Sequence, residues 1–142
     1  MRPDKADQRS LALWATDCAE HVLACFEEKY PNDSRPRNAV EAGRAWARGE
    51  IACGEARAAA VAAHAAARAA DEGAARAAAR AAGHAAGTAH MAGHARHAAA
   101  YAVKAATHAA DAAAATAKER DWQDQHLPEH LRPLAYPARG NS

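Results

Sequence analysis

The residues best able to do chemistry in this sequence are histidines, which supply nine of its 142 residues. Five of them lie close together in the second half of the chain: His84, His90, His94, His97 and His108. His90 and His94 are four residues apart and His94 and His97 are three apart, so each pair shares one helix face and could bind one metal ion. A site for a divalent metal such as zinc, with His84, His90 and His94 as ligand candidates, is therefore one interpretation.

Two other interpretations of the histidines are open. The imidazoles can fill gaps between helices and hydrogen-bond to one another, to Asp17 or to backbone carbonyls. They can also act in acid–base catalysis, and Asp17 and His21 are spaced to meet as a carboxylate–imidazole pair. The chain has no H-E-x-x-H, E-x-x-H or C-x-x-C motif, no nucleophile motif and no phosphate-binding glycine loop. An enzyme is therefore the less favoured class, and no catalytic residue is assigned.

Basic side chains follow the same spacing as the histidines. Arg76, Arg80 and His84 repeat every fourth residue, and a second series with intervals of four and three residues runs from His90 to His108 through His94, His97, Tyr101 and Lys104. Each series lies along one face of a helix. A basic stripe of arginines could contact nucleic acid, but the net charge of +1 and the lack of interleaved aromatic residues argue against it. We expect a solvated face and no nucleic-acid partner.

These side chains stand on an alanine-rich stretch, residues 56–117. Alanine is the strongest intrinsic helix former. One helix of this length would be about 90 Å long, and turn signals at 71–73, 91–93 and 108–111 instead divide it into three antiparallel helices. Alanine faces let helices approach closely, and Gly83 and Gly87 would allow a closer approach still.

The whole chain is predicted to be an all-α, compact antiparallel bundle of about six helices, over 10–29, 34–48, 50–70, 74–91, 93–109 and 111–125, with a short irregular clip at 127–134. Ser10, Ser34 and Asp111 are the expected N-caps. The buried face of 50–70 is expected to hold Ile51, Gly54, Ala58, Val61 and Ala65.

Large apolar side chains are concentrated in residues 1–51 and 118–142, whereas the long middle has only Val61, Met91, Tyr101 and Val103. We therefore expect both ends to fold over the alanine helices and complete one core. This predicts a single domain over 1–142, with an ordered core at about 10–134 and loose ends at 1–9 and 137–142.

Several features favour the cytoplasm. The first ten residues are polar and no apolar signal segment follows them. Charged side chains or histidines interrupt the alanine run, so no membrane contact is expected. Three cysteines, Cys18, Cys25 and Cys53, form no metal or disulfide pattern, which is typical of a reducing compartment.

Seven segments together resemble a known family. They are Leu11–Leu23, Arg35–Pro36, Ala45–Gly49, Ala62–Arg68, Ala82–His90 with His94, Glu119–Gln123 and Leu127–Pro128. They resemble the immunity-five-like group of all-helical bacterial immunity proteins associated with polymorphic toxins, over about residues 10–134. In two places the chain departs from the family pattern: Ala92-Gly93 stands where relatives often have a proline-bearing turn, and His97 looks additional.

The resemblance implies a cytoplasmic inhibitor that neutralises a cognate toxin by binding it, with no cofactor. It also implies a polar cluster at positions that match the family motif: Asp17, His64, His84, His90 and His94. Two alternatives remain beside this one. The first is a helical bundle whose histidines bind a metal or small ligand, with or without enzymatic activity. The second is a structural module, since alanine faces can also pair between chains to give a homodimer.

Overall fold

The structure is a computed structural model that describes residues 4–71, 73–110 and 112–135, with the backbone alone for 112–116. Every regular element in these ranges is helical, which confirms the all-α bundle. The elements are α1 Lys5–Val22, α2 Ala24–Glu27, α3 Arg35–Ala47, α4 Cys53–Ala69, α5 Ala74–Gly87, α6 His94–Ala109, α7 Ala112–His126, the 3-10 helix η1 Glu129–Leu131 and α8 Arg132–Ala135. The cap expected at Asp111 and the end at 137–142 lie outside the described residues. That 1–142 forms one domain stays a prediction.

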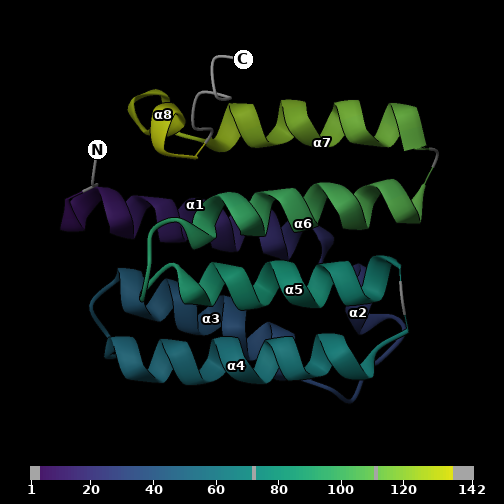
Figure 1. The fold of residues 1–142 in the computed structure, drawn as a ribbon, viewed down its shortest axis with the longest axis horizontal. Helices are drawn as coiled ribbons and strands as arrows, with labels where there is room; N and C mark the ends of the chain where they lie inside the picture. Colours follow the sequence, from purple (N-terminus) through teal and green to yellow (C-terminus); the bar gives the residue numbers. More distant parts are fainter. Residues whose placement is uncertain (1–3, 72, 111, 136–142) are drawn as a thin grey trace.

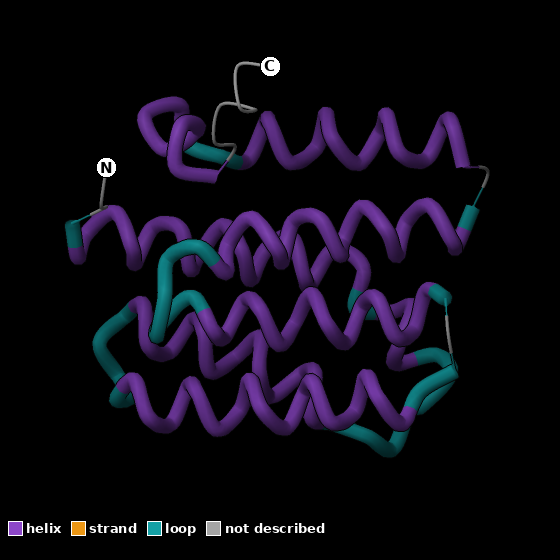
Figure 2. Tube along the Cα trace, in the orientation of Figure 1, coloured by secondary structure: helices purple, strands orange, loops and turns teal. Residues whose placement is uncertain are grey.

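The helices form two layers (Figure 1). Helices α4, α5, α6 and α7 lie side by side, and α1, α2 and α3 lie behind them. Helix α3 packs against α4 and α5, while α1 packs against α5 and α6. Figure 2 shows that short loops join the long helices, so chain neighbours run antiparallel. The N-terminal helices thus cover one side of the alanine-rich layer.

Helix α5 lies at the centre, in contact with α1, α2, α3, α4 and α6. All its buried residues are alanine or glycine, which allows these neighbours to approach it closely. The bulk of the core comes from the chain ends: Leu11, Trp14, Leu23, Phe26, Val40 and Leu131 are each at most 2% exposed. This confirms that the termini supply the large side chains.

The predicted buried face of α4 is wrong. Val61 is 60% exposed, and Gly54 and Ala58 are also exposed. The buried residues are alanines at other positions: Ala56, Ala60, Ala63, Ala66 and Ala67. Since a β-branched side chain would hold the α4 and α5 axes apart, the smaller side chains occupy the contact.

One predicted helix start is wrong. Helix α1 begins at Lys5 rather than Ser10, because Asp4 Oδ1 accepts a hydrogen bond from the Asp7 amide at 2.8 Å, so residues 5–9 are helical and not loose. Ser34 is the N-cap of α3, as predicted, but its side chain makes no capping bond, and Asp33 Oδ1 accepts from the Arg35 amide instead.

None of the described helices is both long enough and apolar enough to cross a bilayer.

The C-terminal elements are fastened to the bundle by buried polar groups. Trp14 Nε1 donates to the Gln123 carbonyl at 3.2 Å, and Gln123 Nε2 donates to the Ala99 carbonyl at 3.0 Å. The expected irregular clip is helical, as η1 and α8, and inserts Leu131 into the core. These contacts place α7 beside α6. The side of α5 and α6 that faces away from α1–α3 is left uncovered by those helices (Figure 1).

Candidate functional site

The two side-chain series of the sequence meet where α5 and α6 pack together. Helix α5 brings Arg76, Arg80 and His84, and antiparallel α6 brings His94, His97, Tyr101, Lys104 and His108. We call these eight residues, together with His64 of α4, the α5–α6 face. A ring cluster at one end is formed by His64, His84, His94, His97 and Tyr101, and a groove at the other end is lined by Arg76, Arg80, Lys104 and His108.

The ring cluster is centred on His84. The centroid of its ring lies 4.8 Å from that of His64, 5.1 Å from that of His94 and 5.2 Å from that of His97. Tyr101 stacks on it at 5.3 Å, with 7° between the ring planes. The Nδ1 atoms of His84 and His94 are 2.9 Å apart and form a hydrogen bond, so one ring donates and the other accepts.

Two glycines of α5 make room for these rings. A Cβ on Gly83 would lie 2.7 Å from Cε1 and Nε2 of His64, and one on Gly87 would lie 3.2 Å from Cδ2 of His94. The close approach predicted at these glycines is thus between helix backbone and imidazole rings.

Electrostatics keep the centre of the cluster neutral. The pKa of His84 is lowered to about 3, mainly by burial and then by the positive charge that His64, His94, His97 and Arg80 can carry. Burial is also the main cause of the lowered pKa values of His64 and His94. The bond between the two Nδ1 atoms requires at least one neutral ring, because only a neutral imidazole has a nitrogen that can accept a hydrogen bond.

The structure separates the three weak metal-ligand candidates. His84 and His94 share a hydrogen bond, whereas His90 is exposed and stacks on neither ring. Within residues 4–71, 73–110 and 112–135, no three His, Cys, Asp or Glu side chains are placed to hold a metal ion.

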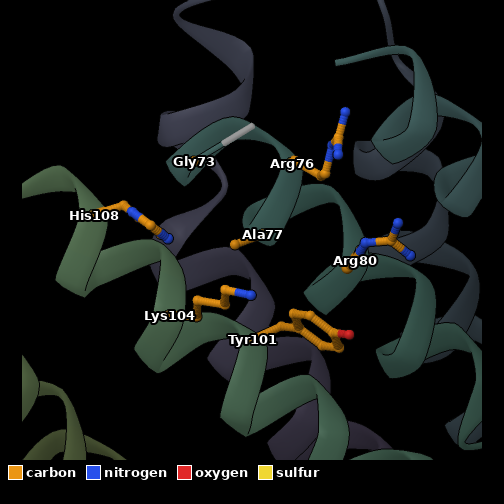
Figure 3. A pocket seen from close by; sticks show the side chains of 7 residues that line it. All are labelled: Gly73, Arg76, Ala77, Arg80, Tyr101, Lys104 and His108. Carbon is orange, nitrogen blue, oxygen red and sulfur yellow. The ribbon is translucent and has the colours of Figure 1, made fainter. Parts of the chain in front are cut away.

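A basic groove forms the other end of the α5–α6 face (Figure 3). It has a volume of about 610 Å³ and is lined by Gly73, Arg76, Ala77, Arg80, Tyr101, Lys104 and His108. Arg76 donates from Nε and Nη2 to the Ala70 carbonyl, which ties the turn between α4 and α5. Tyr101 belongs to both ends, because its ring stacks on His84 and also lines the groove.

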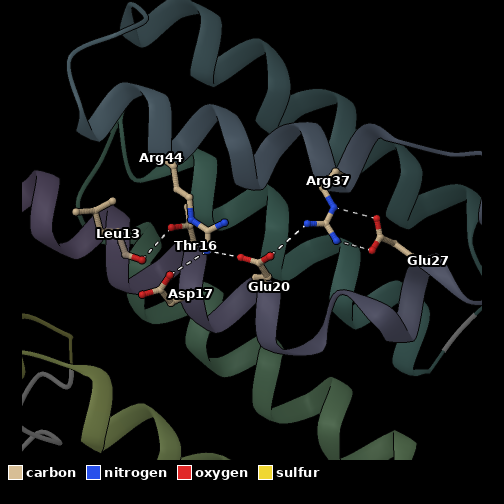
Figure 4. Close-up of polar contacts among 7 residues, drawn as sticks. All are labelled: Leu13, Thr16, Asp17, Glu20, Glu27, Arg37 and Arg44. Atoms are coloured by element: carbon tan, nitrogen blue, oxygen red, sulfur yellow. Dashed lines mark hydrogen bonds and ion pairs between the residues drawn. The ribbon is translucent and has the colours of Figure 1, made fainter.

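Asp17, a predicted member of the polar cluster, lies elsewhere, in an acid–arginine network between α1 and α3 (Figure 4). Arg44 Nη2 lies 2.9 Å from Asp17 Oδ1 and also pairs with Glu20, while Arg37 pairs with Glu27 at 2.6 Å. Hydrogen bonds from these arginines lower the pKa values of Glu20 and Glu27.

The predicted pair of Asp17 and His21 is not the contact that the structure shows. His21 Nε2 instead lies 3.2 Å from Oε2 of Glu119, and its ring packs on Trp122. Burial raises the pKa of Glu119, which is 3% exposed and also accepts a hydrogen bond from Gln123.

Of the five residues predicted as a cluster, the structure brings together His64, His84 and His94. It places Asp17 in the arginine network and His90 outside the ring cluster. His97 and Tyr101 were missed as site residues, although their spacing on α6 relative to His94 carried the signal.

The chain was compared with known protein families. Residues 2–130 match the family described as "Imm-5 like putative immunity protein". Because the match covers most of the sequence, the chain belongs to this family of immunity proteins. No curated protein and no solved structure matched the chain.

Proposed function

We propose that this immunity protein neutralises a cognate toxin by binding it directly, and that the α5–α6 face makes the contact. One observation carries the choice of face: the α5–α6 face gathers two arginines, a lysine, a tyrosine and five histidines on a side of the bundle that α1 and α3 leave uncovered. Aromatic residues and arginine are enriched among the residues that dominate binding energy at interfaces.

The electrostatics of the face favour binding over catalysis. A histidine that acts as a general base is usually oriented by a carboxylate or a backbone carbonyl. Here His84 and His94 bond to each other, and no carboxylate of the described residues contacts the ring cluster. Low pKa values leave these rings uncharged near pH 7, so they can be desolvated at an interface at little cost.

The test co-expresses the protein with the toxin encoded beside its gene and measures growth and complex formation. The wild type should restore growth and co-elute with the toxin on a sizing column. His97→Ala with Tyr101→Ala removes two rings that are exposed or half-buried, so the bundle should remain folded. We expect this double variant to weaken toxin binding at least about tenfold, since central aromatic contacts often contribute over 1–2 kcal/mol each.

The matched control is Glu41→Ala with Arg48→Ala on α3 and the turn after it, where both side chains are exposed. It should bind the toxin like the wild type. Undiminished toxicity in the presence of the wild type, with no complex, would refute the function; equal weakening by the control would refute the choice of face.

We also infer that the protein acts in the cytoplasm, because its three cysteines are free thiols.

The alternative function, a structural module that forms a homodimer, would be detected by sedimentation of the purified protein.

A further inference from the structure

Basic side chains on the α1–α3 side of the bundle have carboxylate partners, whereas several of those in the basic groove do not. On the α1–α3 side, Arg35, Arg37 and Arg44 each form an ion pair with a carboxylate. In the basic groove, no hydrogen bond or ion pair joins Arg80, Lys104 or His108 to another described residue. The groove lining includes no carboxylate among those residues. The positive charges of Arg80 and Lys104 thus lie in a concave site whose described lining includes no carboxylate.

We propose that the basic groove binds a phosphorylated small molecule carrying at least two negative charges. This site and ligand go beyond toxin binding and do not depend on it.

The two walls of the groove supply complementary donors. Arg80 stands on α5 and presents a planar guanidinium fork, which can donate two parallel hydrogen bonds to a phosphate. Lys104 stands on α6 and presents a compact ammonium group, which attracts phosphate as a point charge. Figure 3 shows both side chains beside the Tyr101 ring, so one anion could meet donors from both helices.

Tyr101 lies beside Lys104 in the groove. The Tyr101 ring stacks on His84, and Lys104 Nζ lies 6.0 Å from the centroid of the Tyr101 ring. A ring at this distance attracts the ammonium group without neutralising its charge, so Lys104 stays available to an anion.

The size of the groove selects the ligand class. A lone phosphate ion would leave most of its roughly 610 Å³ empty, whereas pockets for small organic ligands span about 300–1,000 Å³. The space exists because Gly73 and Ala77 line it without large side chains. A phosphate ester with an organic group fits both the charge and the volume.

The test uses pyrophosphate as the probe, at pH 7.5 and constant low ionic strength. Calorimetry should show saturable binding with one site per chain, and amide NMR shifts should concentrate at residues 76–80 and 101–108. Arg80→Gln with Lys104→Gln should weaken binding about a hundredfold, because hydrogen bonds to charged groups contribute about 1.5–3 kcal/mol each.

The control, Arg48→Gln, removes an exposed positive charge from the turn between α3 and α4 and should change the affinity less than about twofold. Circular dichroism verifies that each variant is folded. The proposal is overturned if the binding of pyrophosphate does not saturate, or if the control weakens binding as much as the groove variant. It is also overturned if citrate binds as tightly as pyrophosphate. Because no toxin is present, a negative result here leaves the toxin-binding measurement unaffected.

Discussion

Acid should destabilise the protein through His84. Burial, together with nearby positive charge, lowers its pKa to about 3 in the folded state, from an ordinary value of 6.5. Between these two pH values the unfolded chain binds a proton at this position and the folded chain does not. The stability that depends on a neutral His84 is therefore fully present above about pH 6.5 and is lost as the pH falls toward 3.

The size of the effect follows from the shift. Each pKa unit corresponds to about 1.4 kcal/mol, so the full shift would amount to about 5 kcal/mol. Solvent screening reduces this figure because the His84 ring is only partly buried. We expect about 2 kcal/mol of the free energy of unfolding to be lost through His84 between pH 7 and pH 4.5.

Urea unfolding of the wild type and of His84→Gln, followed by tryptophan fluorescence at several pH values, measures this loss. The difference between the two proteins cancels most of the contribution of the carboxylates, so it should fall by about 2 kcal/mol over this range. A His108→Gln control, which removes an exposed ring outside the cluster, serves as the comparison for the loss of a buried ring. The reasoning would be refuted if the difference in unfolding free energy between His84→Gln and the wild type did not change with pH. An NMR titration that gave His84 a pKa near its ordinary value would also refute it.

Three further substitutions test the packing by chemical denaturation. Gly43→Ala would place a Cβ 2.7 Å from Thr16 Cγ2 and should destabilise by about 1–2 kcal/mol, with recovery when Thr16→Ser removes that methyl group. Val61→Ala should change stability by less than about 0.5 kcal/mol, because Val61 is mostly exposed, and a loss above 1 kcal/mol would contradict this. Leu131→Ala should cost about 2–4 kcal/mol, because its side chain is fully buried; a neutral result would show that the C-terminal clip does not contribute to the core.

The side-chain series on α5 and α6 could be predicted because three- and four-residue intervals place residues on one helix face. The spacing of Arg76, Arg80 and His84 was sufficient for α5, and that of His94, His97 and Tyr101 for α6. Spacing within a helix cannot show which neighbour that face meets, so the grouping of His64, His84 and His94 came only from the family resemblance, and spacing alone did not predict the ring cluster.

Alanine explains the error on α4. Where nearly every position is alanine, hydrophobicity hardly varies around the helix, and one larger residue then dominates the pattern. Val61 was that residue, yet the helix turns it outward, because close packing on α5 favours the smallest side chains.

Contacts between residues far apart in the sequence could not be predicted from residue spacing along one helix either. The four-residue spacing predicted that Asp17 would meet His21, but Arg44, 27 residues away, provides a permanently charged donor to Asp17. His21 is left to pair with Glu119 on α7, a contact that depends on how the C-terminal helix docks.

The central claim is that the α5–α6 face binds the toxin, and cross-saturation NMR tests it most directly. Irradiating unlabelled toxin in complex with deuterated, nitrogen-15-labelled protein attenuates amide signals at the interface. The account predicts the strongest attenuation in α5 and α6, around His84, His97 and Tyr101. Attenuation confined to α1 and α3, with those residues unaffected, would contradict it.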